Sequence, residues 1–126
     1  MKLEDLRSIG ANIKNKRLCD ICIQKAMEYI NEFEAILLDV RVPSNIKDKN
    51  AQEAKIPNAY YTPYTDFVNY VNILPDNKNT PIIVASYEGW FASRVKEYLE
   101  MLGFNNIYIL CNNIEDWISD HLKIAK

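Results

Sequence analysis

The sequence has 126 residues, of which 48% are hydrophobic, and its formal net charge at pH 7 is −2. A chain of this length buries one hydrophobic core, so we expect a single globular domain. The nearly neutral charge excludes a general electrostatic attraction to nucleic acid or to an anionic membrane. Any partner must therefore be recognised by a local feature of the surface.

The beginning of the chain has a pattern of its own. Apolar residues recur there at helical spacing, but Gly10 and the polar stretch NIKNK weaken a helix. We expect an N-terminal arm or short helix over residues 1–15, followed by one folded domain over residues 16–126. The sequence has neither a signal-peptide pattern nor an apolar run of about 18 residues, so we expect a cytoplasmic protein without a membrane partner.

Short apolar runs and amphipathic stretches alternate through the rest of the chain. The expected strands are RLCDICI (17–23), AILLDV (35–40), PIIVA (81–85) and NIYIL (106–110), and the expected helices are QKAMEYINEF (24–33), YTDFVNYVNIL (64–74), FASRVKEYLEML (91–102) and NNIEDWISDHL (112–122). Gly103 is the expected left-handed stop of the third helix, and Asn113 is the expected N-cap of the last. Such alternation predicts an α/β fold with a parallel sheet and helices on both faces.

The stretch TPIIVASYEGWFASR (80–94) carries the candidate site, because it leads from a buried strand through a loop into a helix. Ligands of parallel sheets bind beyond the carboxyl ends of the strands. Backbone N–H groups at the helix start could hold an anion, with Gly89 allowing the loop to curl, whereas the Glu88 carboxylate opposes an anion. Ser86 could act as a nucleophile only with a base, and the one histidine, His121, lies far away in sequence on an apolar helical face.

Several segments together resemble the rhodanese family. ILLDVR, AKIPNA, PIIVASYEGW and LEMLGFNNIYILCNNIEDW occur in the family's order and at approximately its spacing, from Cys19 to Leu122. The residues that carry the resemblance are Asp39, Arg41, Ile56, Pro57, Ala59, Gly103, Phe104, Ile114 and Trp117. The resemblance implies a five-stranded parallel sheet between helices, with an active loop after the fourth strand. We expect structural roles for the family anchors Asp39, Arg41, Pro57, Gly103 and Trp117.

The active loop departs from the family at the residue that carries the chemistry. In rhodaneses a cysteine closes the strand before the loop and accepts a sulfane sulfur as a persulfide, and here that residue is Ser86. A serine hydroxyl cannot form a persulfide, and it ionises far less readily than a thiol. We therefore expect no catalytic residue in the loop, no metal, no cofactor and no ordinary sulfurtransferase activity.

Other family positions are also altered. Arg94 comes three residues later than the usual loop arginine, so its reach into the loop is doubtful. Asn112 and Asn113 replace a double glycine, and Lys55 and Asn58 replace a common histidine and glycine. Asparagine tolerates left-handed backbone, so the turns are expected to survive.

The loop face admits two interpretations. In the first, it binds an unknown protein partner or a small anion through the loop residues, which are Ser86, Tyr87, Glu88, Gly89, Trp90, Phe91, Ala92 and Arg94. In the second, the loop is a connecting turn whose aromatic residues pack on the domain.

The three cysteines leave a further alternative open. Their odd number, without an export signal, favours reduced thiols over a disulfide framework. Cys19 and Cys22 could join Cys111 and His121 in a zinc set, or could form a redox pair, although CDIC is more typical of small apolar residues. Cys111 ends the last strand on the edge of the active loop. The alternative function is thus a divergent sulfurtransferase, or a carrier of thiosulfate or persulfide sulfur, that uses Cys111 or Cys22. A third possibility is a phosphatase of the same fold, but such enzymes also need the missing cysteine.

Overall fold

The computed structural model describes residues 19–87 and 89–124. Its elements, in chain order, are α2 (Ile23–Phe33), β1 (Ile36–Asp39), the 3-10 helix η2 (Pro43–Asn45), β2 (Ala59–Tyr61), the 3-10 helix η3 (Tyr64–Ile73), β3 (Ile82–Ala85), α3 (Gly89–Met101), β4 (Ile107–Ile109) and α4 (Ile114–Ile124). The arm expected over residues 1–15 lies outside the described residues.

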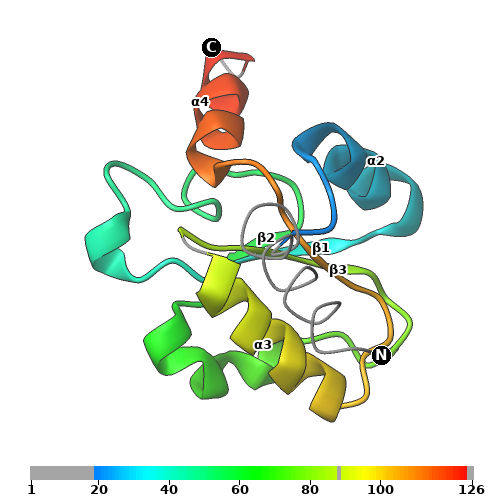
Figure 1. Ribbon diagram of the computed structural model, residues 1–126. Helices are drawn as coiled ribbons and strands as arrows, with labels where there is room; N and C mark the ends of the chain where they lie inside the picture. Colours follow the sequence, from blue (N-terminus) through cyan, green and yellow to red (C-terminus); the bar gives the residue numbers. More distant parts are fainter. Residues whose placement is uncertain (1–18, 88, 125–126) are drawn as a thin grey trace, which may run out of the picture.

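The strands form one parallel sheet in the order β2-β1-β3-β4. Helices α2 and α4 cover one face, and α3 and η3 cover the other (Figure 1). Neighbouring residues of β1 point to opposite faces, so Leu37 packs with the α2 and α4 side chains and Leu38 packs with those of α3 and η3. Both leucines are fully buried, which explains why the β1 sequence is a continuous apolar run. The predicted α/β class and two-sided sheet are confirmed.

Within residues 19–87 and 89–124 the sheet has four strands, and the expectation of five is wrong. The stretch RLCDICI contributes one isolated parallel bridge, between Ile21 and Leu110. Asp20 limits the pairing, because its carboxylate accepts a hydrogen bond from the Ile109 N–H at 2.9 Å in place of a strand carbonyl. Helix α2 then begins at Ile23, so no further residue can extend the pairing.

Strand β2 was not indicated by the hydrophobic pattern. It has three residues, and none of them is fully buried, because β2 lies at the edge of the sheet. It is held in place by backbone pairing with β1, with Ala59 beside Leu37 and Tyr61 beside Asp39.

The helix expected over residues 64–74 is a 3-10 helix instead. Only Phe67 of this element is buried, and Val68, which was expected on the inner face, is 62% exposed. The valines, asparagines and isoleucine of this stretch have low α-helical propensity, and the three-residue spacing of Tyr64 and Phe67 matches the tighter turn of a 3-10 helix.

Both predicted helix boundaries are confirmed. Gly103 has a φ of 98°, and the Phe104 N–H donates to the Leu99 carbonyl at 3.1 Å, which closes the end of α3. Asn113 caps α4 by accepting the Glu115 N–H on its side-chain oxygen at 3.0 Å.

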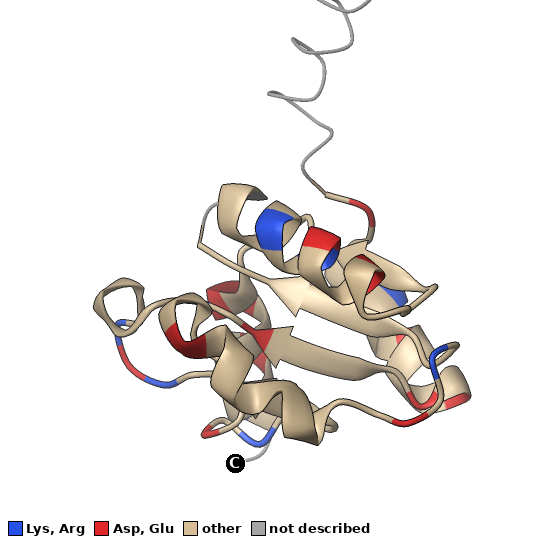
Figure 2. Cartoon of the chain, turned by 90° about the horizontal axis from the view of Figure 1, so that it is seen from below, with Lys and Arg blue, Asp and Glu red and all other residues tan. Residues whose placement is uncertain are grey.

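Charges are interspersed among the elements in the view of Figure 2, which agrees with the small net charge. Among the described residues, the helices are too short or too polar to cross a membrane.

Candidate functional site

The carboxyl edge of the sheet gathers residues from distant parts of the chain. The Ala85 carbonyl, at the end of β3, accepts the Val40 N–H at 2.9 Å, and Ser86 follows directly. On the other side of β3, the Leu110 N–H donates to the Val84 carbonyl at 2.9 Å, so Cys111 lies just beyond the end of the neighbouring strand β4. Strands of one sheet lie about 4.8 Å apart, which places Ser86 and Cys111 at adjacent strand ends.

His121 is kept away from this edge. Helix α4 begins just after Cys111, and His121 lies in its last turn. The rise of an α-helix carries a residue of the last turn roughly 10 Å from the first turn. The structure therefore does not bring His121 together with Ser86.

The loop after β3 is short. Ser86, Tyr87 and Glu88 separate β3 from α3, and Glu88 lies outside the described residues. Ser86 is half-buried, whereas 60% of Tyr87 is exposed. The proposed anion cradle in this loop stays a prediction.

The aromatic residues near the loop divide into packed and exposed side chains. Phe91 is half-buried, and its ring centroid lies 4.7 Å from that of Tyr64 in η3 and 5.1 Å from that of Trp90. Trp90 itself remains 54% exposed. Ala92 is fully buried in the core beneath α3, so its expected place in the binding surface is wrong.

Arg94 contacts other residues of α3. Its guanidinium carbon lies 5.8 Å from the Trp90 ring centroid, and its Nη1 lies 3.6 Å from a Glu97 carboxylate oxygen. These contacts place its positive charge beside Trp90.

A groove that the sequence did not indicate runs between η3 and α3. Its volume is about 370 Å³, and its lining residues are Tyr64, Thr65, Phe67, Val68, Arg94, Val95, Glu97, Tyr98 and Met101. Met101 is 83% exposed at one end, and Tyr64 joins the groove to Trp90 at the other, with 6.0 Å between their ring centroids. We call Tyr87, Trp90 and this groove the apolar surface.

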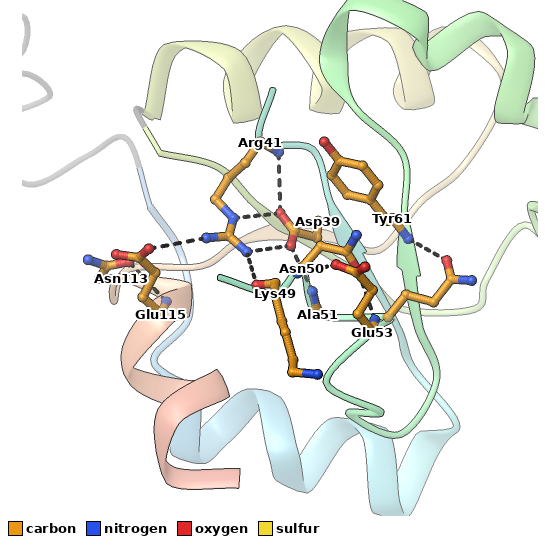
Figure 3. Close-up of polar contacts among 10 residues, drawn as sticks. Asp39, Arg41, Lys49, Asn50, Ala51, Glu53, Tyr61, Asn113 and Glu115 are labelled. Atoms are coloured by element: carbon orange, nitrogen blue, oxygen red, sulfur yellow. Dashed lines mark hydrogen bonds and ion pairs between the residues drawn. The ribbon is translucent and has the colours of Figure 1, made fainter. Parts of the chain in front are cut away.

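Asp39 and Arg41 form a buried ion pair at the end of β1 (Figure 3). The Arg41 Nε and Nη2 donate to the two Asp39 carboxylate oxygens at 2.9 and 2.8 Å, and the Ala51 N–H donates to Asp39 at 2.9 Å. Arg41 also reaches the Lys49 carbonyl at 3.4 Å and lies 3.8 Å from a Glu115 carboxylate oxygen in α4. The pair thus joins the end of β1 to the long polar loop and to the start of α4.

The family anchors Trp117 and Pro57 differ in burial. Trp117 is buried in the core on the α2 and α4 face, while Pro57 is exposed in a turn before β2. Lys55 and Asn58, on either side of Pro57, have φ values of 62° and 58°. Asn58 tolerates this backbone well and also donates from its side chain to the Ala35 carbonyl at 3.1 Å.

Tyr61 lies next to the ion pair. Its hydroxyl is buried and has no hydrogen-bond partner among the described residues. Burial and the negative charge of Asp39 both raise the pKa of Tyr61, because each disfavours the phenolate.

Two of the cysteines are joined, so the expectation of reduced thiols is wrong for them. Cys19 and Cys111 form a disulfide, with Cα atoms 4.7 Å apart. They are 92 positions apart in sequence, and backbone contacts of Asp20 and Ile21 with the end of β4 bring them together. The disulfide leaves neither sulfur as a thiolate, so the zinc set does not fit, and Cys22 remains as an exposed thiol.

The sequence profile of the rhodanese-like domain matches residues 23–120. This chain belongs to the rhodanese-like domain family. A curated relative, the thiosulfate sulfurtransferase GlpE of Glaesserella parasuis serovar 5, is 26% identical over 106 residues, which cover 83% of this chain and 91% of the relative.

Two solved structures share the fold of this rhodanese-like domain. One is a polysulfide-sulfur transferase homodimer from Wolinella succinogenes, with a TM-score of 0.62 and 17% identity, covering 92% of this chain and 85% of that one. The other is a full-length protein from Lactobacillus plantarum, with a TM-score of 0.61 and 20% identity, covering 92% of this chain and 95% of that one. The boundary of the domain at residue 16 stays a prediction.

Proposed function

We propose that this rhodanese-like domain does not transfer sulfur at its active loop and instead binds a protein partner through the apolar surface. One observation carries the first half of the proposal. Ser86 directly follows the last residue of β3, where the family resemblance places the sulfur-accepting cysteine. Its hydroxyl offers no sulfur on which a persulfide could form.

The exposed aromatic and apolar side chains support the second half. Tyr87, Trp90, Val68 and Met101 are each more than half exposed. Val68 and Met101 line the groove between η3 and α3, and Trp90 lies next to its lining residue Tyr64. Exposed apolar side chains beside a groove are typical of an interaction site. Glu88 follows Tyr87 in the sequence, and an acidic residue in this loop favours a protein partner over a small anion.

The names of the relatives indicate which sulfur donors to use in testing whether the active loop transfers sulfur. They include a thiosulfate sulfurtransferase and a polysulfide-sulfur transferase, so thiosulfate and polysulfide are the sulfur donors to test. With thiosulfate and cyanide, we expect the chain to form thiocyanate no faster than the buffer alone. Ser86→Cys restores the thiol at the strand end and is expected to form a persulfide, while Ser86→Ala is the matched control that should match the parent chain.

The result that contradicts this half is thiocyanate formation by the parent chain. Loss of that activity in Ser86→Ala would assign it to the loop. Its retention in Ser86→Ala would assign it elsewhere.

A second candidate function is a sulfur carrier at Cys111 or Cys22. Cys111 lies just beyond the end of β4, next to Ser86 at the end of β3, but its sulfur is held in the disulfide and must first be reduced. Cys22 is already an exposed thiol. Intact-mass analysis of the reduced chain after polysulfide treatment tests this candidate, since a persulfide that disappears in Cys111→Ser or in Cys22→Ser would locate the carrier.

Photo-crosslinking tests the binding role. A photoreactive residue in place of Trp90 should capture a partner in cells, and the adduct should be lost when Tyr87→Ser is added. The same residue in place of Lys25, exposed on α2 across the sheet, is the control. Equal capture at both positions would rule out a specific partner of the apolar surface.

A further inference from the structure

The three cysteines gather at one point of the carboxyl edge, although they lie at positions 19, 22 and 111. Cys111 is bonded to Cys19, and its backbone N–H donates to the Ile21 carbonyl at 2.7 Å. That carbonyl belongs to the peptide bond that leads into Cys22. The bridge pairs Ile21 with Leu110, so Cys22 and Cys111 are the residues that directly follow the paired residues.

The three cysteines differ in exposure. Cys22 and Cys111 are exposed residues, whereas Cys19 is half-buried and packs against the core on the α3 face. Cys111 is thus the more exposed residue of the disulfide pair.

The Cys22 thiol does not cap helix α2. Cys22 is the N-cap residue of α2, yet its side chain makes no capping hydrogen bond. Asn112 serves instead, because its side-chain oxygen accepts the Ile23 N–H at 2.9 Å. This hydrogen bond joins the residue after Cys111 to the residue after Cys22. Together with the bond from the Cys111 N–H to the Ile21 carbonyl, it holds the two cysteines close to each other.

We propose that Cys111 exchanges its disulfide partner between Cys19 and Cys22, which makes this edge a thiol–disulfide exchange site for small thiols. The Cys22 thiolate attacks the Cys111 Sγ. A Cys22–Cys111 bond forms, the Cys19–Cys111 bond breaks, and the electron pair goes to the Cys19 Sγ, which takes up a proton equivalent to the one lost by Cys22. No net oxidation or reduction occurs.

A small external thiol enters the same cycle. Its thiolate attacks the Sγ of Cys111, the more exposed residue of the pair, and displaces Cys19, which leaves a mixed disulfide on Cys111. Cys22 then displaces the small thiol from Cys111 and forms the Cys22–Cys111 disulfide. In this sequence Cys22 is the resolving thiol, a role that neither the loop nor the apolar surface requires.

Glutathione and the variant Cys22→Ser test the inference. The oxidised chain is incubated with glutathione, quenched with acid and analysed by intact mass and peptide mapping. The parent chain should show no lasting adduct, whereas Cys22→Ser should accumulate a glutathione adduct on Cys111. Serine is a favoured N-cap residue, so this substitution preserves the start of α2.

Alkylation of the parent chain without glutathione gives a second readout. Exchange should divide the iodoacetamide label between Cys22 and Cys19, whereas a chain without exchange carries the label on Cys22 alone at all times. Label on Cys22 alone, together with equal adducts in parent and variant, would overturn the inference. Neither measurement involves sulfane sulfur or a partner, so its outcome is independent of the proposed function.

Discussion

Asp39 is the buried carboxylate on which three segments of the chain depend. It is fully buried, and it accepts hydrogen bonds from Arg41 and from the Ala51 N–H. We expect Asp39→Ala to lower the free energy of unfolding by about 3–5 kcal/mol, because the substitution leaves the buried Arg41 guanidinium without its bidentate carboxylate partner. Urea denaturation measures the change.

The exposed pair of Lys25 and Glu28 in α2 provides the control. Their Nζ and carboxylate oxygen are 3.3 Å apart, but both side chains are about half exposed. We expect Glu28→Ala to cost at most about 0.5 kcal/mol, because water screens the pair. A cost for Asp39→Ala as small as this would show that the buried pair is not a structural anchor.

The raised pKa of Tyr61 leads us to expect that the stability of the fold falls at alkaline pH. Its pKa is raised above the ordinary value of 10.0, first by burial and then by the charge of Asp39. Above pH 10 the unfolded chain loses this proton while the folded chain keeps it, so the contribution to stability is present below pH 10 and is lost as pH rises through the raised pKa. In Tyr61→Phe this part of the alkaline loss should disappear.

Tyr60→Phe is the matched control, because Tyr60 is the exposed neighbour on the same strand. Urea midpoints between pH 7 and pH 11 compare the two variants. At pH 7 we expect Tyr61→Phe to be neutral or stabilising by up to about 1 kcal/mol, because it removes a buried hydroxyl that lacks a partner. Parallel pH curves for both variants would contradict the role of Tyr61.

At the scale of elements, the turn before β2 stores a small amount of backbone strain. Lys55 has a φ of 62° and an exposed side chain, and left-handed backbone costs a non-glycine residue about 1 kcal/mol. We expect Lys55→Gly to raise the free energy of unfolding by about 0.5–1 kcal/mol and to raise Tm.

The same change in a helix should have the opposite sign. Lys25 lies inside α2, where glycine costs about 1 kcal/mol relative to good helix formers. Thermal unfolding of both variants decides the point, and a lower Tm for Lys55→Gly would mean that its side chain stabilises the turn.

Helix ends and buried strands were the elements that the sequence predicted well. Gly103 and Asn113 act locally, through a left-handed backbone and a side-chain cap, so their neighbours in sequence suffice to predict them. The 3-10 geometry of η3 was missed because the apolar residues of this stretch also fit the spacing of an α-helix, and the low helical propensity of its other residues was not weighed. Strand β2 was missed because its backbone pairing with β1 leaves no hydrophobic signature.

At the scale of the whole molecule, the disulfide joins the first described residue to the end of the sheet. It closes a loop across 92 positions, and constraint of the unfolded chain by such a loop contributes about 2–4 kcal/mol. We expect dithiothreitol to lower the urea midpoint of Cys22→Ser, in which partner exchange is blocked.

The double variant Cys19→Ser, Cys111→Ser is the control, because it has no disulfide to reduce. Its midpoint should be the same with and without dithiothreitol. Coincident midpoints for Cys22→Ser in both conditions would show that the bond does not stabilise the fold.

The sequence alone determined the α/β class, the two-sided sheet and the position of Ser86 at a strand end. These features follow from hydrophobic runs, helix periodicity and caps, which depend only on residues close together in the sequence. Only the tertiary structure decided which distant residues meet. The pairing of Cys19 with Cys111, the packing of Phe91 on Tyr64 and the groove between η3 and α3 all follow from strand order and from crossovers. These contacts join positions far apart in the chain, and no local pattern in the sequence records them.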